Sequence, residues 1–340
     1  MLPLALTTLT ELAAQERDGP RNYVFFGFDR SRIADARFLG ADEIEGAQLK
    51  YSWRELEPVR NEYAFDQVRS DLAFLEGHGK RLFLQLQDVS FVEDRSNVPD
   101  YVMTDPEFGG GVAPQLEFEG EGDLHPSPIG LVARRWDPAV RSRITQLLRA
   151  LGREFDGRIE GISLPETSIE FGTTGRFHPE GFSYEGYAEA VRLVLAAARA
   201  AFPTSKVLIY ANFMPGEWLP WEDRGYLRGI YRYAEEIGAG VGGPDLLPHR
   251  AAQRNHSLAL IAARRDGTPA GMAVQDGNLG ALNPTTGEPV TVAELYGFAR
   301  DTLHLNYLFW GTEEPYFSRE ILPFLRELAR TTRGIAAPRP

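Results

Sequence analysis

The stretch "FDQVRSDLAFLEGHGKRLFLQLQD", residues 65–88, joins a helical pattern to a strand pattern. Its first half places Val68, Leu72 and Leu75 on one face of a predicted helix, which two glycines then terminate. Its second half, residues 81–88, is a short apolar run that ends in Gln-Asp, which is typical of a buried strand leaving a sheet. The stretch therefore predicts one helix–strand unit of an α/β fold.

The same alternation continues in both directions along the chain. Short apolar runs that end in polar residues predict strands, and amphipathic helical patterns lie between them. Such alternation indicates parallel strands with helices outside them, and eight units over about 300 residues predict a (β/α)8 TIM barrel. An open doubly wound sheet is the alternative, but the first strand lacks the Gly-rich phosphate turn typical of that fold. The predicted strands cover 23–29, 46–53, 81–88, 159–166, 206–213, 238–245, 270–277 and 305–314.

One connection is much longer than the others. Residues 89–136 contain "GGG", several prolines and no helical periodicity, so they predict a long loop insertion after strand 3. A loop of this length in a compact domain usually has a function, which here would be a lid or rim of the binding site; a surface decoration is the alternative. The sequence shows no repeat and no linker, so residues 1–340 are predicted to form a single barrel domain.

Composition excludes several classes of function. The 340 residues carry a net charge of −12, which disfavours nucleic acid and anionic membrane surfaces as partners. No cysteine is present, so disulfides, thiolate metal sites and a cysteine nucleophile are excluded. No apolar run is long enough to span a membrane, and residues 1–18 make a poor signal peptide. We therefore expect a soluble protein, cytoplasmic unless a removed signal sent it to the periplasm or outside the cell.

The sequence contains no motif for a metal or a cofactor. Its six histidines are scattered, with no H-E-x-x-H pair, and no calcium-binding loop is present. Walker A, dinucleotide-binding and G-x-S-x-G patterns are also absent. Neither a metal nor a cofactor is therefore expected.

Carboxylates, amides and aromatic residues stand at nearly every predicted strand end. In a (β/α)8 barrel the carboxyl ends of the strands build the site, and these residue types suit a neutral polyhydroxylated ligand such as a sugar. Asp29 as a helix cap, Asp88 as an organiser of the long loop and loop-packing tryptophans are the alternatives. The predicted sugar-binding residues are Asp29, Tyr51, Trp53, Gln87, Asp88, Asn212, Trp218, Trp221, Asp245, Gln275 and Trp310.

Three stretches resemble the clan A glycoside hydrolases. Residues 49–88 contain a Trp at a strand end, then "EP", then an acidic turn that ends in an aromatic–Asp pair. Residues 134–166, "RRWDPAV…GISLPE", resemble the approach of that clan to its fourth strand. Residues 307–317, "YLFWGTEEPYF", resemble its eighth strand, where a Trp forms the floor of the sugar site.

This resemblance implies a retaining mechanism with two glutamates, an acid/base on the fourth strand and a nucleophile on the seventh. By position these roles fall on Glu166 and Asp276. The sequence departs from the clan at both motifs, because Pro165 replaces the usual Asn and Gln275–Asp276 replaces the usual Glu. The shorter Asp raises the hypothesis of inversion, since it leaves room for a water molecule.

Several alternatives remain open at these positions. Glu314 is the second candidate for the partner acid, and Gln87 or Asn212 are the first candidates to replace the missing Asn. Glu166 needs a raised pKa to act as an acid, which an apolar wall of Leu164, Pro165 and Ile169 would provide; pairing with Lys50 is the structural alternative.

The sequence thus predicts a glycoside hydrolase that cleaves β-linked neutral oligo- or polysaccharides. A catalytically inactive carbohydrate-binding barrel is the main alternative, and a lyase or isomerase with Lys50 as base is the third. Sugar identity, linkage, endo or exo action and oligomeric state are not encoded in any recognisable motif.

Overall fold

Eight parallel strands close into a barrel in the order β1-β10-β9-β8-β7-β6-β3-β2. The computed structural model describes residues 19–332 except 94 and 121–122, so the predicted poor signal peptide at 1–18 lies outside the described residues. Each predicted strand is present, and the (β/α)8 prediction is confirmed. The barrel strands are β1 (Arg21–Gly27), β2 (Gly46–Ser52), β3 (Arg81–Gln87), β6 (Gly161–Leu164), β7 (Lys206–Tyr210), β8 (Gly240–Gly243), β9 (Ala270–Val274) and β10 (Tyr307–Trp310).

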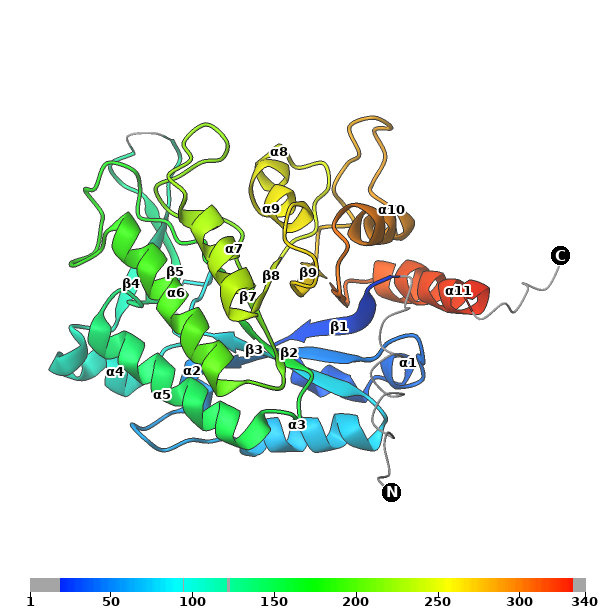
Figure 1. Cartoon of the computed structure of the whole chain (residues 1–340), viewed down its shortest axis with the longest axis horizontal. Helices are drawn as coiled ribbons and strands as arrows, with labels where there is room; N and C mark the ends of the chain where they lie inside the picture. The colour runs from blue at the N-terminus through cyan, green and yellow to red at the C-terminus, as the bar shows by residue number, and fades with distance from the viewer. Residues whose placement is uncertain (1–18, 94, 121–122, 333–340) are drawn as a thin grey trace, which may run out of the picture.

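Helices cover the outside of the barrel (Figure 1). The two longest begin at capping side chains: the Asp137 carboxylate accepts from the amide of Ala139 at 2.8 Å, and the Ser183 hydroxyl from that of Gly186 at 3.0 Å. These bonds satisfy amides that have no partner within the first helical turn. The helices that follow strands of the barrel are α1 (Ala36–Leu39), α2 (Trp53–Leu56), α3 (Asp66–Gly77), α5 (Pro138–Phe155), α6 (Tyr184–Ala201), α7 (Tyr226–Ile237), α8 (Ala251–Gln253), α9 (Ala259–Ala262), α10 (Val292–Gly297) and α11 (Leu322–Thr332).

The barrel has an interior core that is separate from the layer between strands and helices. Side chains alternate between the two faces of a strand, so the residues of this interior core show which positions of each strand point inward. On β2, Gln48 points inward and binds Ser163 and Tyr210, and Lys50 follows it two residues later. On β3, Gln85 and Gln87 follow the inward Phe83. The interior cluster comprises Tyr23, Phe83, Leu208, Ala273, Tyr307 and Phe309.

Glycines in β8 make room for neighbouring strands and for this interior core. A Cβ on Gly242 would lie 1.9 Å from the carbonyl oxygen of Gly271, and one on Gly240 would lie 2.4 Å from a methyl of Leu208. Real Cβ atoms do not approach so closely, so the strand requires glycine at both positions. The weak apolar signal of residues 238–245 therefore reflects close packing.

The connection between β3 and α5 contains regular structure that the sequence did not predict. It holds α4 (Asp100–Thr104) and an antiparallel hairpin of β4 (Val112–Glu117) and β5 (Ser127–Ala133). The amide of Ser90 donates to Leu131 at 2.7 Å, and the amide of Leu116 donates to Glu170 at 3.1 Å. The hairpin thus connects the exits of β3 and β6. A role as a lid stays a prediction.

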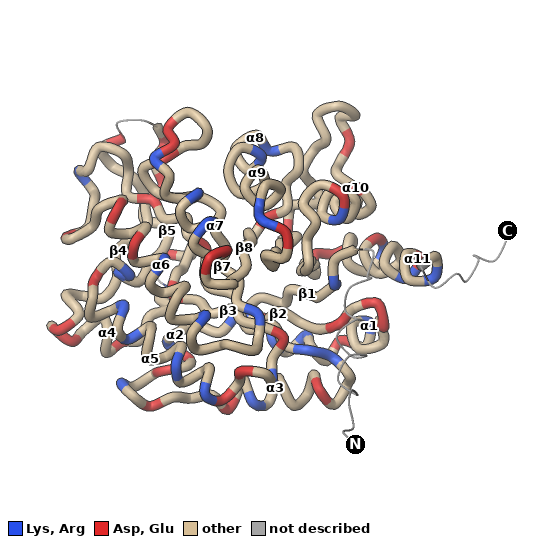
Figure 2. The backbone as a smooth tube through the Cα atoms, in the orientation of Figure 1, with Lys and Arg blue, Asp and Glu red and all other residues tan. Residues whose placement is uncertain are grey.

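Acidic and basic residues are interspersed along the outer helices, for example on α3 (Figure 2). Within residues 19–332, apart from the three undescribed positions, no helix is both long and apolar enough to cross a membrane.

Candidate active site

Glu166 leaves β6 at the carboxyl end of the barrel. Its Oε2 accepts a hydrogen bond of 2.8 Å from Nδ2 of Asn212, which follows β7. The amide of Ser168 donates to the other end of the same Asn212 side chain, at 3.2 Å. Because both ends of that amide are bound, Asn212 positions the Glu166 carboxyl group at the mouth of the barrel, which is the opening at the carboxyl ends of its strands. Nδ2 of Asn212 carries a second hydrogen, so its role in place of the missing Asn at position 165 stays a prediction.

Burial raises the pKa of Glu166 to about 7. The negative charge of Asp245 raises this pKa as well, while the Asn212 hydrogen bond and the positive charges of Lys50 and Arg135 lower it. The expected apolar wall is present, since Leu164, Pro165 and Ile169 are all buried. The Glu166 side chain keeps some exposure, so a ligand can reach it. A carboxyl group in this state can donate a proton near neutral pH.

We expect any activity that needs a proton from Glu166 to fall as the pH rises through about 7. The acid form is the donor, so kcat/KM should be highest below this pKa and lose about tenfold for each pH unit above it. A pH profile of kcat/KM on any substrate of the wild-type protein measures this limb. A rate that rises through pH 7 would exclude Glu166 as the proton donor.

Lys50 and Asp245 share the mouth with Glu166. Burial lowers the pKa of Lys50, and the charges of Glu166 and Asp245 raise it. Asp245 lies two residues beyond β8, and its Oδ1 accepts a 3.1 Å hydrogen bond from Nδ2 of Asn278. Within the described part of the chain, no hydrogen bond or ion pair joins Lys50 to Glu166. The two attract over a longer distance than the direct pairing considered from the sequence.

Asp276 and Glu314 have other charge neighbours. Asp276 follows β9; burial and the negative charge of Glu313 raise its pKa, and Arg32 lowers it. Glu314 lies beyond β10 on the surface, where it pairs with Arg37 at 2.7 Å and accepts from the hydroxyl of Ser318 at 2.5 Å. Glu314 is thus held by Arg37 and Ser318, and its role as the partner acid stays a prediction. Asp276 keeps an exposed position beside Glu313.

Three aromatic residues predicted to contact sugar are buried away from the mouth. The hydroxyl of Tyr51 donates to Asp71 of α3 at 2.7 Å, and Trp53 Nε1 donates to Glu57 at 3.0 Å. Trp310 is fully buried, and its Nε1 donates to Asn22 at 2.9 Å. Tyr51 and Trp310 point outward because the inward positions of β2 and β10 belong to their neighbours. Predicted sugar contacts at these three residues do not fit this placement.

Asp88 organises the long insertion instead of facing a ligand. It is buried and forms an ion pair with Arg135, whose Nε donates at 2.8 Å. Nη1 of Arg135 donates to the hydroxyl of Tyr187 at 3.1 Å and to the carbonyl oxygen of Glu166 at 3.3 Å. This placement matches the alternative considered for Asp88. Arg135, which the sequence analysis missed, thus connects the end of the insertion to the loop that carries Glu166.

The other predicted residues are dispersed. Asp29 lines a cavity of about 490 Å³ on the flank of the barrel next to α3, and it forms no cap of the following helix. Gln87 is buried on the inward face of β3. Nε2 of Gln275 donates to the carbonyl of Pro244 at 2.9 Å. Trp221 is 72% exposed. Of the predicted set, the structure brings Asn212 and Asp245 into the surroundings of Glu166.

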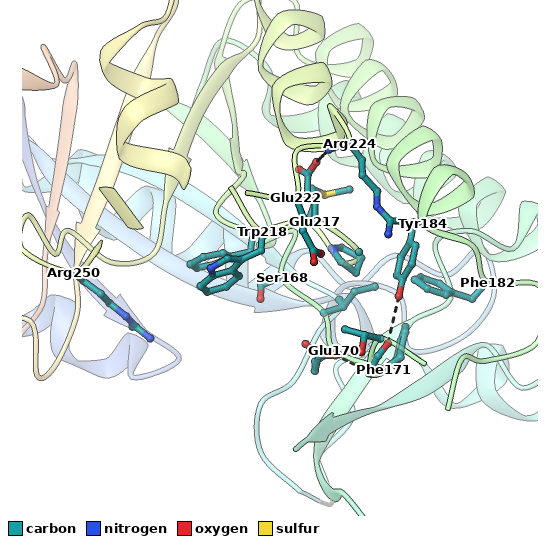
Figure 3. Close-up of a pocket in the computed structure, with 17 residues that line it drawn as sticks. Ser168, Glu170, Phe171, Phe182, Tyr184, Glu217, Trp218, Glu222, Arg224 and Arg250 are labelled. Carbon is teal, nitrogen blue, oxygen red and sulfur yellow. Dashed lines mark hydrogen bonds between the residues drawn. The ribbon is translucent and has the colours of Figure 1, made fainter. Parts of the chain in front are cut away.

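A cavity of about 520 Å³ opens between the loops that follow β6 and β7 (Figure 3). Trp218 is 47% exposed there and stacks on Phe213, with ring centroids 5.7 Å apart and planes 10° apart. Figure 3 shows Arg250 on one side of Trp218 and Tyr184 with Phe182 on the other. Ser168, which also lines the cavity, donates its amide to Asn212, so the cavity adjoins the Glu166 site.

Sequence reasoning missed two features of this region. It named Trp218 but not the cavity, although aromatic residues are dense over residues 171–184 and 213–221. It also considered Lys50 only as a partner of Glu166 or as the base of a lyase or isomerase. A lysine inside an apolar strand could itself have indicated a site residue. Among the described residues, no group of three or more His, Asp or Glu side chains is arranged to hold a metal ion.

Comparison with known proteins identifies the fold. No protein-family model and no curated protein matches the sequence. A GH10 endoxylanase from a sugarcane soil metagenome is 15% identical with a TM-score of 0.52, covering 89% of each chain. A GH5_18 variant from Streptomyces cattleya in complex with Manβ1-4GlcNAc is 15% identical, with a TM-score of 0.56 over 94% of this chain and 83% of that chain. Xylanase 10B from Thermotoga petrophila RKU-1 in complex with xylobiose is 11% identical, with a TM-score of 0.54 over 97% and 99%. At these identities the likeness shows that the chain shares the (β/α)8-barrel fold of these enzymes.

Proposed function

We propose that this protein hydrolyses β-glycosidic bonds of a neutral oligo- or polysaccharide, with Glu166 as the general acid/base. One observation carries the proposal: a carboxyl group with a pKa of about 7 is fixed by Asn212 at the end of the fourth barrel strand. Structural neighbours that are GH10 and GH5 glycoside hydrolases support the same reading.

Hydrolysis needs two carboxyl groups with different protonation states. Glu166 in its acid form protonates the glycosidic oxygen while the bond to the anomeric carbon breaks. A second carboxylate attacks that carbon or takes a proton from the water that attacks it. The clan A resemblance gives this second role to Asp276, and Glu314 is the second candidate from the sequence. No cofactor takes part in this chemistry.

The cavity beside Glu166 offers a surface for sugar rings. Apolar faces of pyranose rings pack on aromatic side chains, and the stacked Trp218 and Phe213 present such a face. Two structural neighbours are solved in complex with disaccharides, xylobiose and Manβ1-4GlcNAc. The proposed substrate therefore extends from the mouth across the loops that follow β6 and β7.

The proposal is tested by release of reducing sugar from glucans, mannans, xylans and galactans, measured beside binding to the same panel. We expect release from at least one polysaccharide below pH 7. Binding without release at every pH would instead favour an inactive carbohydrate-binding barrel. Gln275 motivates that second candidate, because it occupies the end of β9 where the resemblance expects a glutamate.

We expect Trp218→Ala to weaken sugar binding by about two- to tenfold, because a stacked aromatic ring contributes on the order of 0.5–1.5 kcal/mol beyond its buried area. Isothermal titration calorimetry with an oligosaccharide that binds the wild type measures the effect. Trp221→Ala is the matched comparison, since Trp221 is not among the residues that line the cavity. A larger loss from Trp221→Ala than from Trp218→Ala would place the sugar elsewhere.

A further inference from the structure

We propose that Asp245 is the second catalytic carboxylate, the base that activates water opposite Glu166. This inference rests on the proposed function, because it presumes that Glu166 is the general acid of a glycosidase. It departs from the sequence prediction, which placed Asp245 among the sugar-binding residues and gave the second role to Asp276. It also departs from the resemblance, since Asp245 follows the sixth barrel strand, β8, and Asp276 follows the seventh, β9.

The order of the strands supports this pairing. In the barrel β6 pairs with β7, and β7 pairs with β8, so one strand separates the elements that lead to Glu166 and Asp245. Neighbouring strands lie about 4.8 Å apart, which places β6 and β8 about 10 Å apart. Inverting glycosidases hold their two carboxyl groups roughly 6.5–9.5 Å apart to admit a water molecule. Carboxyl groups that point toward the barrel axis from the ends of these two strands would stand near that range.

Both carboxyl groups are held in the same way. Asn212 donates to one oxygen of Glu166 at 2.8 Å, and Asn278 donates to one oxygen of Asp245 at 3.1 Å. The side-chain oxygen of Asn278 accepts in turn from the amide of Gln275 at 3.0 Å, which fixes its orientation. Each amide therefore positions one carboxyl group and contacts only one of its two oxygens. The second oxygen remains for the reaction.

Lys50 lies within electrostatic range of both groups. The charges of Glu166 and Asp245 both act on its ammonium group. In the described part of the chain, no hydrogen bond or ion pair joins any two of these three side chains directly. All three side chains are partly exposed, so solvent reaches the groups between which we place the sugar ring and one water molecule.

Asp276 has surroundings that suit the base role less well. Its side chain is exposed, and Glu313 is the carboxylate whose charge raises its pKa. Oε2 of Glu313, which follows β10, accepts from the amide of Gly277 at 2.7 Å, so the acidic pair lies where the exits of β9 and β10 meet. For Glu166, by contrast, the carboxylate whose charge raises the pKa is Asp245.

The reaction balances with these groups and one water molecule. Asp245 accepts a proton from the water molecule while the oxygen of that water forms a bond to the anomeric carbon. The bond from that carbon to the glycosidic oxygen breaks, and the electron pair takes the proton of Glu166. The products are two sugars, a protonated Asp245 and an ionised Glu166. The sugar whose anomeric carbon was attacked has the inverted configuration there. Exchange of a proton with solvent restores both groups.

The test compares Asp245→Asn, Asp276→Asn and Glu166→Gln on 2,4-dinitrophenyl β-cellobioside, β-xylobioside and β-mannobioside and on the polysaccharide panel. Dinitrophenolate leaves without a proton, so Glu166→Gln should keep most of its activity on the aryl glycosides. Asp245→Asn should lose about 10²–10⁴-fold in kcat on both kinds of substrate. Azide should restore turnover of Asp245→Ala on the aryl glycosides, because this anion attacks the anomeric carbon directly and needs no base; the product is a glycosyl azide. Asp66→Asn, on the exposed start of α3, is the control substitution.

Each outcome decides between the assignments. NMR of the first-formed anomer should show inversion; a first product of retained configuration overturns the base role of Asp245. A loss of activity confined to Asp276→Asn, with Asp245→Asn within tenfold of the wild type, also overturns it and leaves the glycosidase proposal standing. If Asp245→Asn folds poorly, the azide response of Asp245→Ala still decides, because no response contradicts the inference. Wild-type protein that turns over none of these substrates contradicts the proposed function itself.

Discussion

The Glu166→Gln variant is expected to lose about 10²–10⁴-fold in kcat on polysaccharide with little change in KM. Glutamine has the shape of glutamate but cannot donate a proton to a leaving oxygen. Its side-chain oxygen can still accept the hydrogen bond from Asn212, which is 2.8 Å long in the wild type, so the loop should keep its conformation. Initial rates of reducing-sugar release over a range of substrate concentrations separate kcat from KM.

Glu170→Gln is the matched control, because both acids lie on the loop after β6. Glu170 is exposed and accepts from the amide of Gly172 at 2.6 Å, whereas burial raises the pKa of Glu166. We expect Glu170→Gln to alter KM more than kcat, since Glu170 lines the cavity. A larger loss of kcat in Glu170→Gln than in Glu166→Gln would transfer the acid role to Glu170.

The barrel was predictable because its signals are local. Strands such as β7 and β9 are apolar runs that end in polar residues, and α5 and α6 start at the capping side chains of Asp137 and Ser183. The hairpin of β4 and β5 was not predictable in this way. Its strands contain Pro114, Pro128 and Gly130, which weaken the strand pattern, and it is held by contacts with distant segments.

The residues that face the mouth were harder to predict than the strands that carry them. In β10 every residue from Tyr307 to Trp310 is buried, so hydrophobicity does not tell which of them points into the barrel. The register of β2 raises the same difficulty: Tyr51 was chosen, whereas its neighbour Lys50 faces the mouth. Packing across the barrel decides this alternation, and a single strand does not encode it.

The choice between Asp245 and Asp276 illustrates the same limit. Both follow a strand end within a short turn, "GGPD" and "VQDG", and the two turns look equivalent in the sequence. Their neighbours distinguish them: Asn278 donates a hydrogen bond to Asp245, whereas the negative charge of Glu313 acts on Asp276. Those contacts depend on how loops from three strands meet.

The buried pair of Asp88 and Arg135 holds the insertion against the candidate site. Both side chains are at most 5% exposed. The guanidinium group also donates to the hydroxyl of Tyr187 and to the carbonyl oxygen of Glu166. In addition, the amide of Ala133 donates to the carbonyl oxygen of Asp88 at 3.0 Å. One arginine thus connects the exit of β3, the end of the insertion and the loop of the proposed acid.

We expect Arg135→Met to lower the free energy of unfolding by about 3–5 kcal/mol, because it leaves the Asp88 charge buried without a partner. Urea denaturation followed by circular dichroism measures the loss. The double variant Asp88→Asn/Arg135→Met should recover part of it, since no buried charge then remains. Arg60→Met, which breaks the exposed pair with Glu107, is the control and should have a much smaller effect. The kcat of Arg135→Met should fall as well, because the Glu166 carbonyl loses a donor. If Arg135→Met were as stable as Arg60→Met, the pair would not be what holds the insertion in place.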